Sequence, residues 1–261
     1  MSTMVAVTTS AVAAAASCVE AKSISVTLWR RTRAAGLCAA LLLALAACAP
    51  AEEKSSDASQ KPVATQAVPR GQGFDFYVLS LSWSPSYCEA EGQRANGQQC
   101  RAGRPYAFVV HGLWPQFERG YPENCPTSKS DLSSAELRSL YDLMPSSGLI
   151  RHQWRKHGAC SGLTQDDYFK VLRAAREKIE IPREFERLGT YKTLTPGQAE
   201  RAFLSANPAL KSDEIAVTCD RRYLREVRIC MTKELDFRAC PEIERRACRL
   251  DKVVMPPVRE R

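Results

Sequence analysis

The chain has 261 residues, and its 37 Lys and Arg against 29 Asp and Glu give a formal net charge of +8. A basic chain suits a polyanionic ligand, although part of this charge lies in the N-terminal leader described below. Its eleven cysteines include no Cys-x-x-Cys pair, which argues against a zinc site. The apolar run near the N-terminus is too short for a stable membrane-spanning helix.

Residues 1–48 are expected to form an N-terminal leader that directs export. Residues 28–48 hold a basic stretch, a run rich in Ala and Leu, and small residues before Cys48, which is the pattern of a signal peptide. Residues 1–27 do not resemble a signal, so an over-extended start, with the true start near Val26, is one interpretation. Cys48 after Leu-Ala-Ala is typical of a bacterial lipoprotein site, and ordinary cleavage nearby is the alternative. We therefore expect a periplasmic or secreted protein, either free or lipid-anchored to the envelope through Cys48.

Residues 49–72 predict a flexible tether, because they are rich in Ala, Ser, Glu, Lys, Gln and Pro and almost lack large apolar side chains. Residues 73–261 are then the folded unit, and this length suits one domain with a sizeable core. Eight cysteines remain after the three of the leader, and an even number in an exported domain argues for disulfides. Many connectivities are open; proximity and nesting favour Cys88–Cys100, Cys230–Cys240 inside Cys219–Cys248, and, as the remainder, Cys125–Cys160.

The first half of this unit predicts two core strands and two loops. Aromatic-rich alternation predicts a strand over 74–83, ended by a proline, and the polar residues 88–105 predict a loop. A second buried strand is expected over 106–113, with His111 at its end, and a second loop over 118–132. A strand end is a rigid position from which a side chain can reach a cleft.

The rest of the chain predicts helices followed by strands. Helical spacing of apolar residues predicts helices over 133–144, 149–157 and 164–179, and one or two more over 184–206, interrupted at Pro196 and Gly197. Alternation predicts strands over 214–219 and 223–231. Strands and helices do not alternate regularly, so we expect an α+β fold: an antiparallel β-sheet core with flanking helices, stabilised by disulfides.

All three histidines lie in two short segments, His-Gly-Leu-Trp-Pro at 111–115 and His-Gln-Trp-Arg-Lys-His-Gly-Ala-Cys at 152–160. On a helix, four polar residues of the second segment share one face, namely His152, Gln153, Lys156 and His157. Histidines can give and take a proton near neutral pH, and a lysine can stabilise an anion. The set predicts phosphoryl transfer without a metal or other cofactor, with an ordinary solvated helix face as the alternative.

A zinc site is a poorer explanation of this helix face. Zinc-binding helices of one well-known type place two histidines four residues apart with a glutamate between them. Here His152 and His157 are five residues apart, no acidic residue intervenes, and Lys156 adds positive charge that opposes a metal. A bound phosphate relieves the crowding of positive groups. RNA supplies an internal nucleophile in its 2′-hydroxyl, so an RNA phosphodiester fits best, with other phosphoesters as alternatives.

The two segments resemble the active-site segments of the ribonuclease T2 family, the exported acid-type ribonucleases. Phe-Tyr-Val-Leu-Ser-Leu-Ser-Trp at 76–83, the Tyr-Cys pair at 87–88 and the C-terminal cysteines are also similar to that family's pattern. The resemblance covers essentially all of 73–261, and the export signal favours the bacterial periplasmic members. It implies a metal-independent endoribonuclease of α+β fold that cleaves single-stranded RNA through a 2′,3′-cyclic phosphate, by transesterification and then hydrolysis.

The resemblance also implies roles for individual side chains. His157 would be the general base on the 2′-hydroxyl and His111 the general acid, with the roles exchanged when the cyclic phosphate is hydrolysed. His152 would bind the phosphate, and Lys156 would stabilise the transition state. We expect an RNA substrate, no obligatory protein partner and a monomer.

Base-binding residues follow from the same resemblance. Trp114 would stack on a base, with a core position as its alternative. Tyr121 would flank that base or be an ordinary loop tyrosine, and Gln116 could help to choose the base. The residues expected to border a second base site are Pro145, Ser146 and Ser147.

The chain departs from the family pattern at two positions. Gln153 stands where the family usually has glutamate; its amide can still bind a phosphoryl oxygen, but it carries no charge and cannot tune Lys156 in the same way. We therefore expect lower activity or a shifted pH optimum. Ser82 stands where the family often has glutamine, which weakens the expected second base site. A non-catalytic RNA- or polyanion-binding protein on the same fold is the alternative function, and a metal-dependent phosphoesterase is a third.

Overall fold

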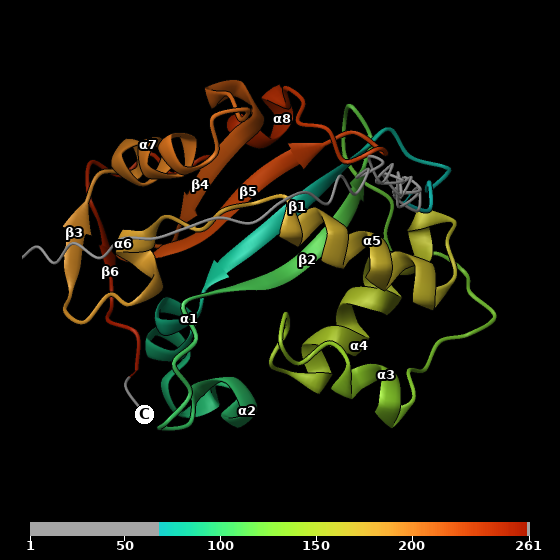
Figure 1. Cartoon of the computed structure of the whole chain (residues 1–261), viewed down its shortest axis with the longest axis horizontal. Coiled ribbons are helices and arrows are strands. Elements are labelled where there is room, and N and C mark those ends of the chain that lie inside the picture. The colour runs from blue at the N-terminus through green and yellow to red at the C-terminus, as the bar shows by residue number, and fades with distance from the viewer. Residues whose placement is uncertain (1–67, 260–261) are drawn as a thin grey trace, which may run out of the picture. The chain divides into compact units, whose positions relative to one another are not determined.

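The computed structural model describes residues 68–259 (Figure 1). The predicted leader, Cys48 and most of the predicted tether lie outside these residues. The end of that tether packs on the folded unit: the Gln72 amide donates a hydrogen bond to the Ser161 carbonyl at 2.8 Å. Arg70 also forms an ion pair with Glu234 at 2.5 Å. The packed chain therefore begins a few residues before 73. No helix within 68–259 is long and apolar enough to cross a membrane.

A four-stranded antiparallel sheet forms the centre of the fold, in the order β2-β1-β5-β4 (Figure 1). A second, two-stranded sheet pairs β3 with β6. The strands are β1 (Phe76–Trp83), β2 (Phe108–Gln116), β3 (Lys192–Leu194), β4 (Ile215–Cys219), β5 (Leu224–Met231) and β6 (Val253–Met255). The predicted α+β fold with an antiparallel sheet is thereby confirmed.

Helices flank this sheet. They are α1 (Ser84–Glu91), α2 (Gly97–Cys100), α3 (Ser134–Arg138), α4 (Ser147–Lys156), α5 (Gln165–Glu177), α6 (Arg183–Glu186), α7 (Pro196–Ala206) and α8 (Pro241–Glu244). Short 3₁₀ turns occur at η1 (Gly92–Arg94), η2 (Gly158–Ser161) and η3 (Ser212–Glu214). Helices α4 and α5 pack against β2, and α7 packs against β4.

The two faces of the sheet differ in polarity. Alternate residues of β1 and β5, such as Leu79 and Val227, are fully buried against the helices and form the main core. The opposite face carries only a small apolar cluster around Phe76 and Val78. Polar side chains of β1, β2 and β5 occupy the rest of that face, and this is where the candidate site lies.

The structure corrects several predicted elements. Residues 84–100 contain α1 and α2, where a loop was expected from residue 88, and Pro85 lies in the first turn of α1, where a missing N–H is tolerated. Only the first part of 133–144 is helical, as α3, and it begins with a capping box at Ser133. Pro196 and Gly197 begin α7 instead of interrupting a helix, because Thr195 caps it through a hydrogen bond from the Gln198 amide. Strands β3 and β6 were not predicted.

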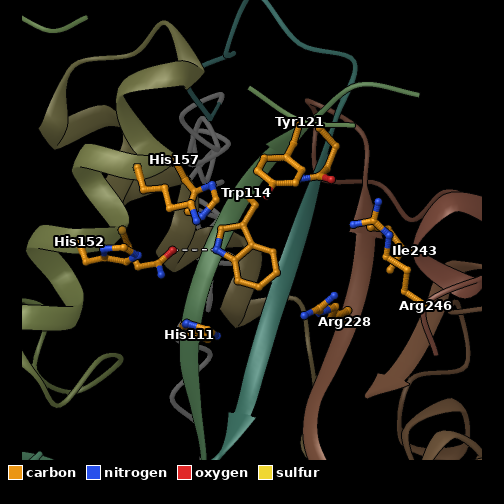
Figure 2. A pocket seen from close by; sticks show the side chains of 11 residues that line it. His111, Trp114, Tyr121, His152, His157, Arg228, Ile243 and Arg246 are labelled. Atoms are coloured by element: carbon orange, nitrogen blue, oxygen red, sulfur yellow. Dashed lines mark hydrogen bonds between the residues drawn. The ribbon is translucent and has the colours of Figure 1, made fainter. Parts of the chain in front are cut away.

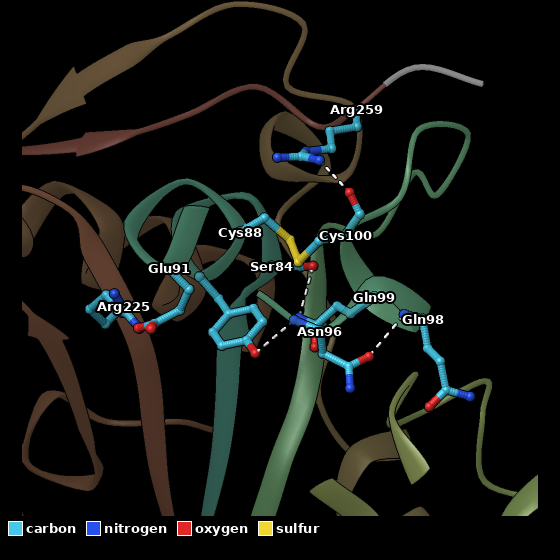
Figure 3. Close-up of a disulfide and its surroundings, with 10 residues drawn as sticks. Ser84, Cys88, Glu91, Asn96, Gln98, Gln99, Cys100, Arg225 and Arg259 are labelled. Atoms are coloured by element: carbon cyan, nitrogen blue, oxygen red, sulfur yellow. Dashed lines mark hydrogen bonds and ion pairs between the residues drawn. A yellow bond between two sulfur atoms is a disulfide. The ribbon is translucent and has the colours of Figure 1, made fainter. Parts of the chain in front are cut away.

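All four predicted disulfides are confirmed: Cys88–Cys100, Cys125–Cys160, Cys219–Cys248 and Cys230–Cys240. The Cys88–Cys100 bond joins α1 to α2, where Gln99 Nε2 also donates to Ser84 Oγ at 3.0 Å (Figure 3). The Cys125–Cys160 bond joins the loop after β2 to η2, directly after α4, across a separation of 35 residues. Chain-entropy reasoning gives this bond about 4 kcal/mol of stabilisation.

Candidate active site

A hollow of about 260 Å³ opens on the polar face of the sheet, between α4 and the strands (Figure 2). Its lining residues are His111, Trp114, Gln116, Tyr121, His152, Gln153, Lys156, His157, Arg228, Ile243 and Arg246. The five residues expected to be catalytic and the three expected to bind the first base therefore surround one cavity. Within 68–259, no group of three or more His, Cys, Asp or Glu side chains is arranged to hold a metal ion.

A β-bulge turns His111 toward this hollow. The pairing of β2 with β1 shifts by one residue, so His111 has no partner on β1. Val110 and Leu113 both face the main core although they are three residues apart, and His111 and Trp114 consequently share the opposite face. His111 was expected at the end of its strand. It lies in the middle of Phe108–Gln116, and the bulge is what presents it.

The glycine of the first segment has a steric role. Trp114 Nε1 donates a hydrogen bond to Gln153 Oε1 at 2.7 Å (Figure 2). A β-carbon on Gly112 would lie 2.2 Å from that oxygen and 2.3 Å from the indole nitrogen. Only glycine therefore allows α4 to approach β2 closely enough for this bond. The carbonyl of the Gln153 side chain is already engaged, and its NH₂ group remains for other partners.

Helix α4 carries the second segment as its spacing predicts. Ser146 caps the helix, accepting a hydrogen bond from the Leu149 amide at 3.3 Å. Trp154 is 2% exposed and packs in the main core, whereas His152, Gln153 and Lys156 line the hollow. Gly158 follows α4, where a β-carbon would lie 2.6 Å from the Trp154 ring. This close packing fixes the position of His157, the residue that follows the helix.

His157 is buried among positive groups. Only 7% of the residue is exposed, and its Nδ1 has no hydrogen-bond partner among the described residues. Burial, and then the charges of Lys156 and the other two histidines, lower the pKa of His157 to about 3. Burial and Lys156 also lower the pKa of His152. The His157 ring is therefore neutral near pH 7 and able to accept a proton.

His111 has a different neighbour, a carboxylate that the sequence analysis missed. Its Nδ1 forms a short ion-pair contact with Oε1 of Glu226 on β5. Arg228 donates to Glu226 Oε2 from Nε at 2.9 Å and from Nη2 at 2.8 Å. Burial would raise the pKa of Glu226, but the hydrogen bond and charge of His111 and the charge and hydrogen bond of Arg228 lower it to about 2. The signal in the sequence was three charged residues, 225, 226 and 228, in an otherwise apolar strand.

Lys156 also has a carboxylate partner that was not predicted. Its Nζ lies 3.3 Å from Oε2 of Glu123, in the loop after β2. Both side chains are partly exposed, so this pair is held loosely and contributes little to stability. The ammonium group remains within reach of an anion that enters the hollow.

A second hollow, of about 220 Å³, lies on the other side of His111. Its lining residues are Ser82, Tyr87, Gln99, Val109, His111, Ser146, Leu149, Arg225 and Glu226. Of the three residues expected to border a second base site, Ser146 lines this hollow, whereas Pro145 and Ser147 line neither. Ser147 instead donates from its amide and its hydroxyl to Gln98 Oε1, each at 3.1 Å.

The two aromatic residues of the first hollow differ in solvent exposure and in how closely other groups pack on them. Trp114 is partly buried and packs against the small apolar cluster around Phe76 and Val78. The Arg228 guanidinium lies 5.1 Å from its ring and the His157 ring 5.4 Å from it. Tyr121 is 41% exposed. Its ring therefore offers the more accessible surface for an incoming base.

Comparison with known proteins points to one family. The model of the ribonuclease T2 family matches residues 74–240. A ribonuclease of Aeromonas hydrophila is 38% identical over 178 residues, which is 66% of this chain and 78% of that protein. Ribonuclease I of Escherichia coli is 26% identical over 214 residues, with 66% and 80% covered.

Solved structures show the same fold at lower identity. Trichomaglin, described as an S-like ribonuclease, superposes with a TM-score of 0.57 at 21% identity and covers 71% of this chain and 99% of its own. RNase NT in complex with 5′-AMP superposes with a TM-score of 0.52 at 24% identity, with 71% and 100% covered.

Proposed function

The chain belongs to the ribonuclease T2 family and is an endoribonuclease, and from this premise we propose how it works. It cleaves single-stranded RNA through a 2′,3′-cyclic phosphate, with His157 and His111 transferring protons and without a metal ion. One observation carries this proposal. Two histidines border the same hollow in opposite electrostatic surroundings, one buried beside cations and the other against a carboxylate. Such pairs are how a protein separates an acid from a base.

In the first step, the 2′-oxygen attacks the phosphorus and His157 takes the hydroxyl proton. The buried, neutral ring of His157 suits this role, because a base must be unprotonated when the substrate binds. The bond from phosphorus to the 5′-oxygen breaks, and His111 gives its proton to that oxygen. In the second step, water attacks the cyclic phosphate while His111 accepts a proton and His157 returns one.

The charge that grows on the phosphoryl oxygens needs positive partners in the hollow. Lys156 and His152 line it from α4, and we assign the phosphate to them. Lys156 exchanges its loose contact with Glu123 for the phosphate. Gln153 contributes a neutral NH₂ donor, because its carbonyl accepts from Trp114.

The two hollows suit the two nucleotides on either side of the scissile phosphate. His111 lines both of them, which agrees with a phosphate that sits between two bases. We assign the base upstream of the phosphate to the first hollow, with Tyr121, Trp114 and Gln116. We assign the downstream base to the second hollow. Of the three residues expected to border that base, Ser146 lines this hollow.

The leader predicts that this ribonuclease is exported, to the periplasm or beyond, and Cys48 is the point at which a lipid would anchor it. We propose that it acts there as a monomer, without an obligatory protein partner. Labelling with a radioactive fatty acid, compared between the full chain and a Cys48→Ser variant, tests the anchor. Incorporation that does not depend on Cys48 contradicts it.

The test of the activity is RNA cleavage by the mature, fully oxidised protein in EDTA. We expect products with cyclic-phosphate ends, and loss of cleavage in His111→Ala and in His157→Ala. Arg155→Ala is a matched control, because Arg155 lies on α4 but is exposed and does not line the hollow. RNA binding without cleavage would favour the non-catalytic alternative, and activity that returns only with added divalent metal would favour a metal-dependent phosphoesterase.

A further inference from the structure

The contact between Glu226 and His111 spans three strands. Glu226 lies on β5 and His111 on β2, and β1 runs between them. Strands are about 4.8 Å apart, so the two backbones are separated by about 10 Å, which a glutamate and an imidazole can cover only by leaning toward each other. They meet across the serines that β1 presents on this face, Ser80 and Ser82.

Ser82 makes this contact sterically feasible. It pairs directly with Glu226 in the register of β1 with β5, so their β-carbons lie on one face within about 5.5 Å of each other. A long side chain at 82, such as glutamine, would compete with the Glu226 side chain for the same space. The small serine leaves this space open.

The first hollow has no carboxylate of its own. None of the described residues that line it is Asp or Glu, whereas Lys156, Arg228 and Arg246 are all cations. Gln153, which also lines it, is neutral. Glu226 is the carboxylate that lies against a histidine of this site.

We propose that Glu226 is a positioning residue for His111: it holds the ring by its Nδ1–H, aims Nε2 at the leaving oxygen, and supplies negative charge beside a hollow whose lining has no carboxylate. Only 11% of the Glu226 side chain is exposed, so it acts through His111 and not on the substrate. The inference rests on the proposed function, in which His111 is the acid.

Arg228 completes the arrangement. Its two hydrogen bonds hold Glu226 Oε2 and leave Oε1 for His111. One other charged group near the pair is Arg225 on β5, which is itself paired with Asp220 at 3.0 Å. The others are His152 and Lys156 on α4, and His157 directly after it. A carboxylate held in this way fixes one tautomer of the ring and stabilises its charged form without taking its proton.

The test compares Glu226→Gln and Glu226→Asp in the mature protein. General acid catalysis contributes roughly 10² to 10⁴-fold, so we expect kcat on a dinucleotide substrate to fall at least about 10-fold in Glu226→Gln, with KM little changed. Glu226→Asp keeps the charge on a shorter arm and is expected to lie between Glu226→Gln and the wild type. Glu214→Gln is the matched control: Glu214 is also a buried glutamate, 6% exposed, and lines neither hollow.

NMR of the histidine ring nitrogens shows which nitrogen of each neutral ring carries the proton. This measurement uses the wild-type protein and needs neither enzyme activity nor a folded variant. With three histidines in the chain, each ring can be assigned, and we expect the neutral His111 ring to carry its proton on Nδ1. A proton on Nε2 in the wild type overturns the proposal. So does a folded Glu226→Gln protein with wild-type kcat and the wild-type His111 tautomer, and in that case the proposed function still stands. If the wild type cleaves no RNA, the proposed function fails, and the tautomer alone still decides whether Glu226 positions the ring.

Discussion

Trp114 and Gln153 are joined by a hydrogen bond of 2.7 Å between the indole N–H and the side-chain carbonyl. The bond ties the strand that carries His111 to the helix that carries the other two histidines. It directly joins the two sequence segments that hold the candidate catalytic residues.

Gly112→Ala is expected to break this bond. The added β-carbon would lie 2.2 Å from Gln153 Oε1, and the buried side chains around it must shift, at a cost of about 1–3 kcal/mol for overpacking. Denaturant unfolding measures the loss, and RNA cleavage falls with it because His111 and α4 move apart. Gly148→Ala is the control, since its β-carbon would meet only Ser146 Oγ at 3.9 Å. Equal stability in the two variants would contradict the prediction.

The pH dependence of kcat/KM is expected to have its acidic limb well below pH 6. Burial and the neighbouring cations lower the pKa of His157 to about 3, and the base stops working only when it is protonated. Lys156→Met removes one of those cations, which makes protonation easier and moves the limb to higher pH, while the rate also falls. Arg155→Ala leaves the limb in place. A wild-type limb near the ordinary histidine value of about 6.5 would show that His157 is not held neutral in this way.

Gln153→Glu places a carboxylate in the lining of the first hollow. The new carboxylate still accepts the Trp114 hydrogen bond, and its negative charge beside His157 raises the pKa of that ring. We expect the acidic limb of kcat/KM to move to higher pH and the rate at neutral pH to rise. An unchanged limb would mean that position 153 does not act on the base electrostatically.

Tyr121→Ala and Trp114→Ala are expected to act differently. Stacking on a base contributes about 1–3 kcal/mol, and Tyr121 is 41% exposed. Its removal should therefore raise KM roughly 5- to 150-fold without a change in the free energy of unfolding. Trp114→Ala also removes the hydrogen bond to Gln153, so it lowers stability as well. Calorimetry and steady-state kinetics separate the two effects, and a stability loss in Tyr121→Ala would contradict this assignment.

The sequence predicted what local spacing controls. The helix that carries His152 and Lys156 and the nested C-terminal cysteines follow from residues close together in the chain. The residues that line the first hollow were predicted to share one site because each of the two histidine segments is distinctive and the family resemblance links them.

The parts that escaped prediction depend on neighbours far apart in the chain. Glu226 meets His111 only because β1 lies between β2 and β5, and no local pattern reveals the order of strands. The bulge at His111 is likewise a property of a strand pair, so alternation within one strand cannot show it. Helix α2 is a single capped turn that a disulfide stabilises. Its sequence is polar and has no helical pattern of apolar residues, so the sequence did not predict it.

The Cys125–Cys160 disulfide has a consequence for when the site can exist. It links the loop that contains Tyr121 and Glu123 to the segment that follows His157. The positions of residues on both sides of the hollow therefore depend on one covalent bond. Cytosolic thiols are kept reduced, and disulfides form after export. Under the export that we propose for this chain, the site would be completed only after the chain has left the reducing cytosol, away from the RNA of its own cell.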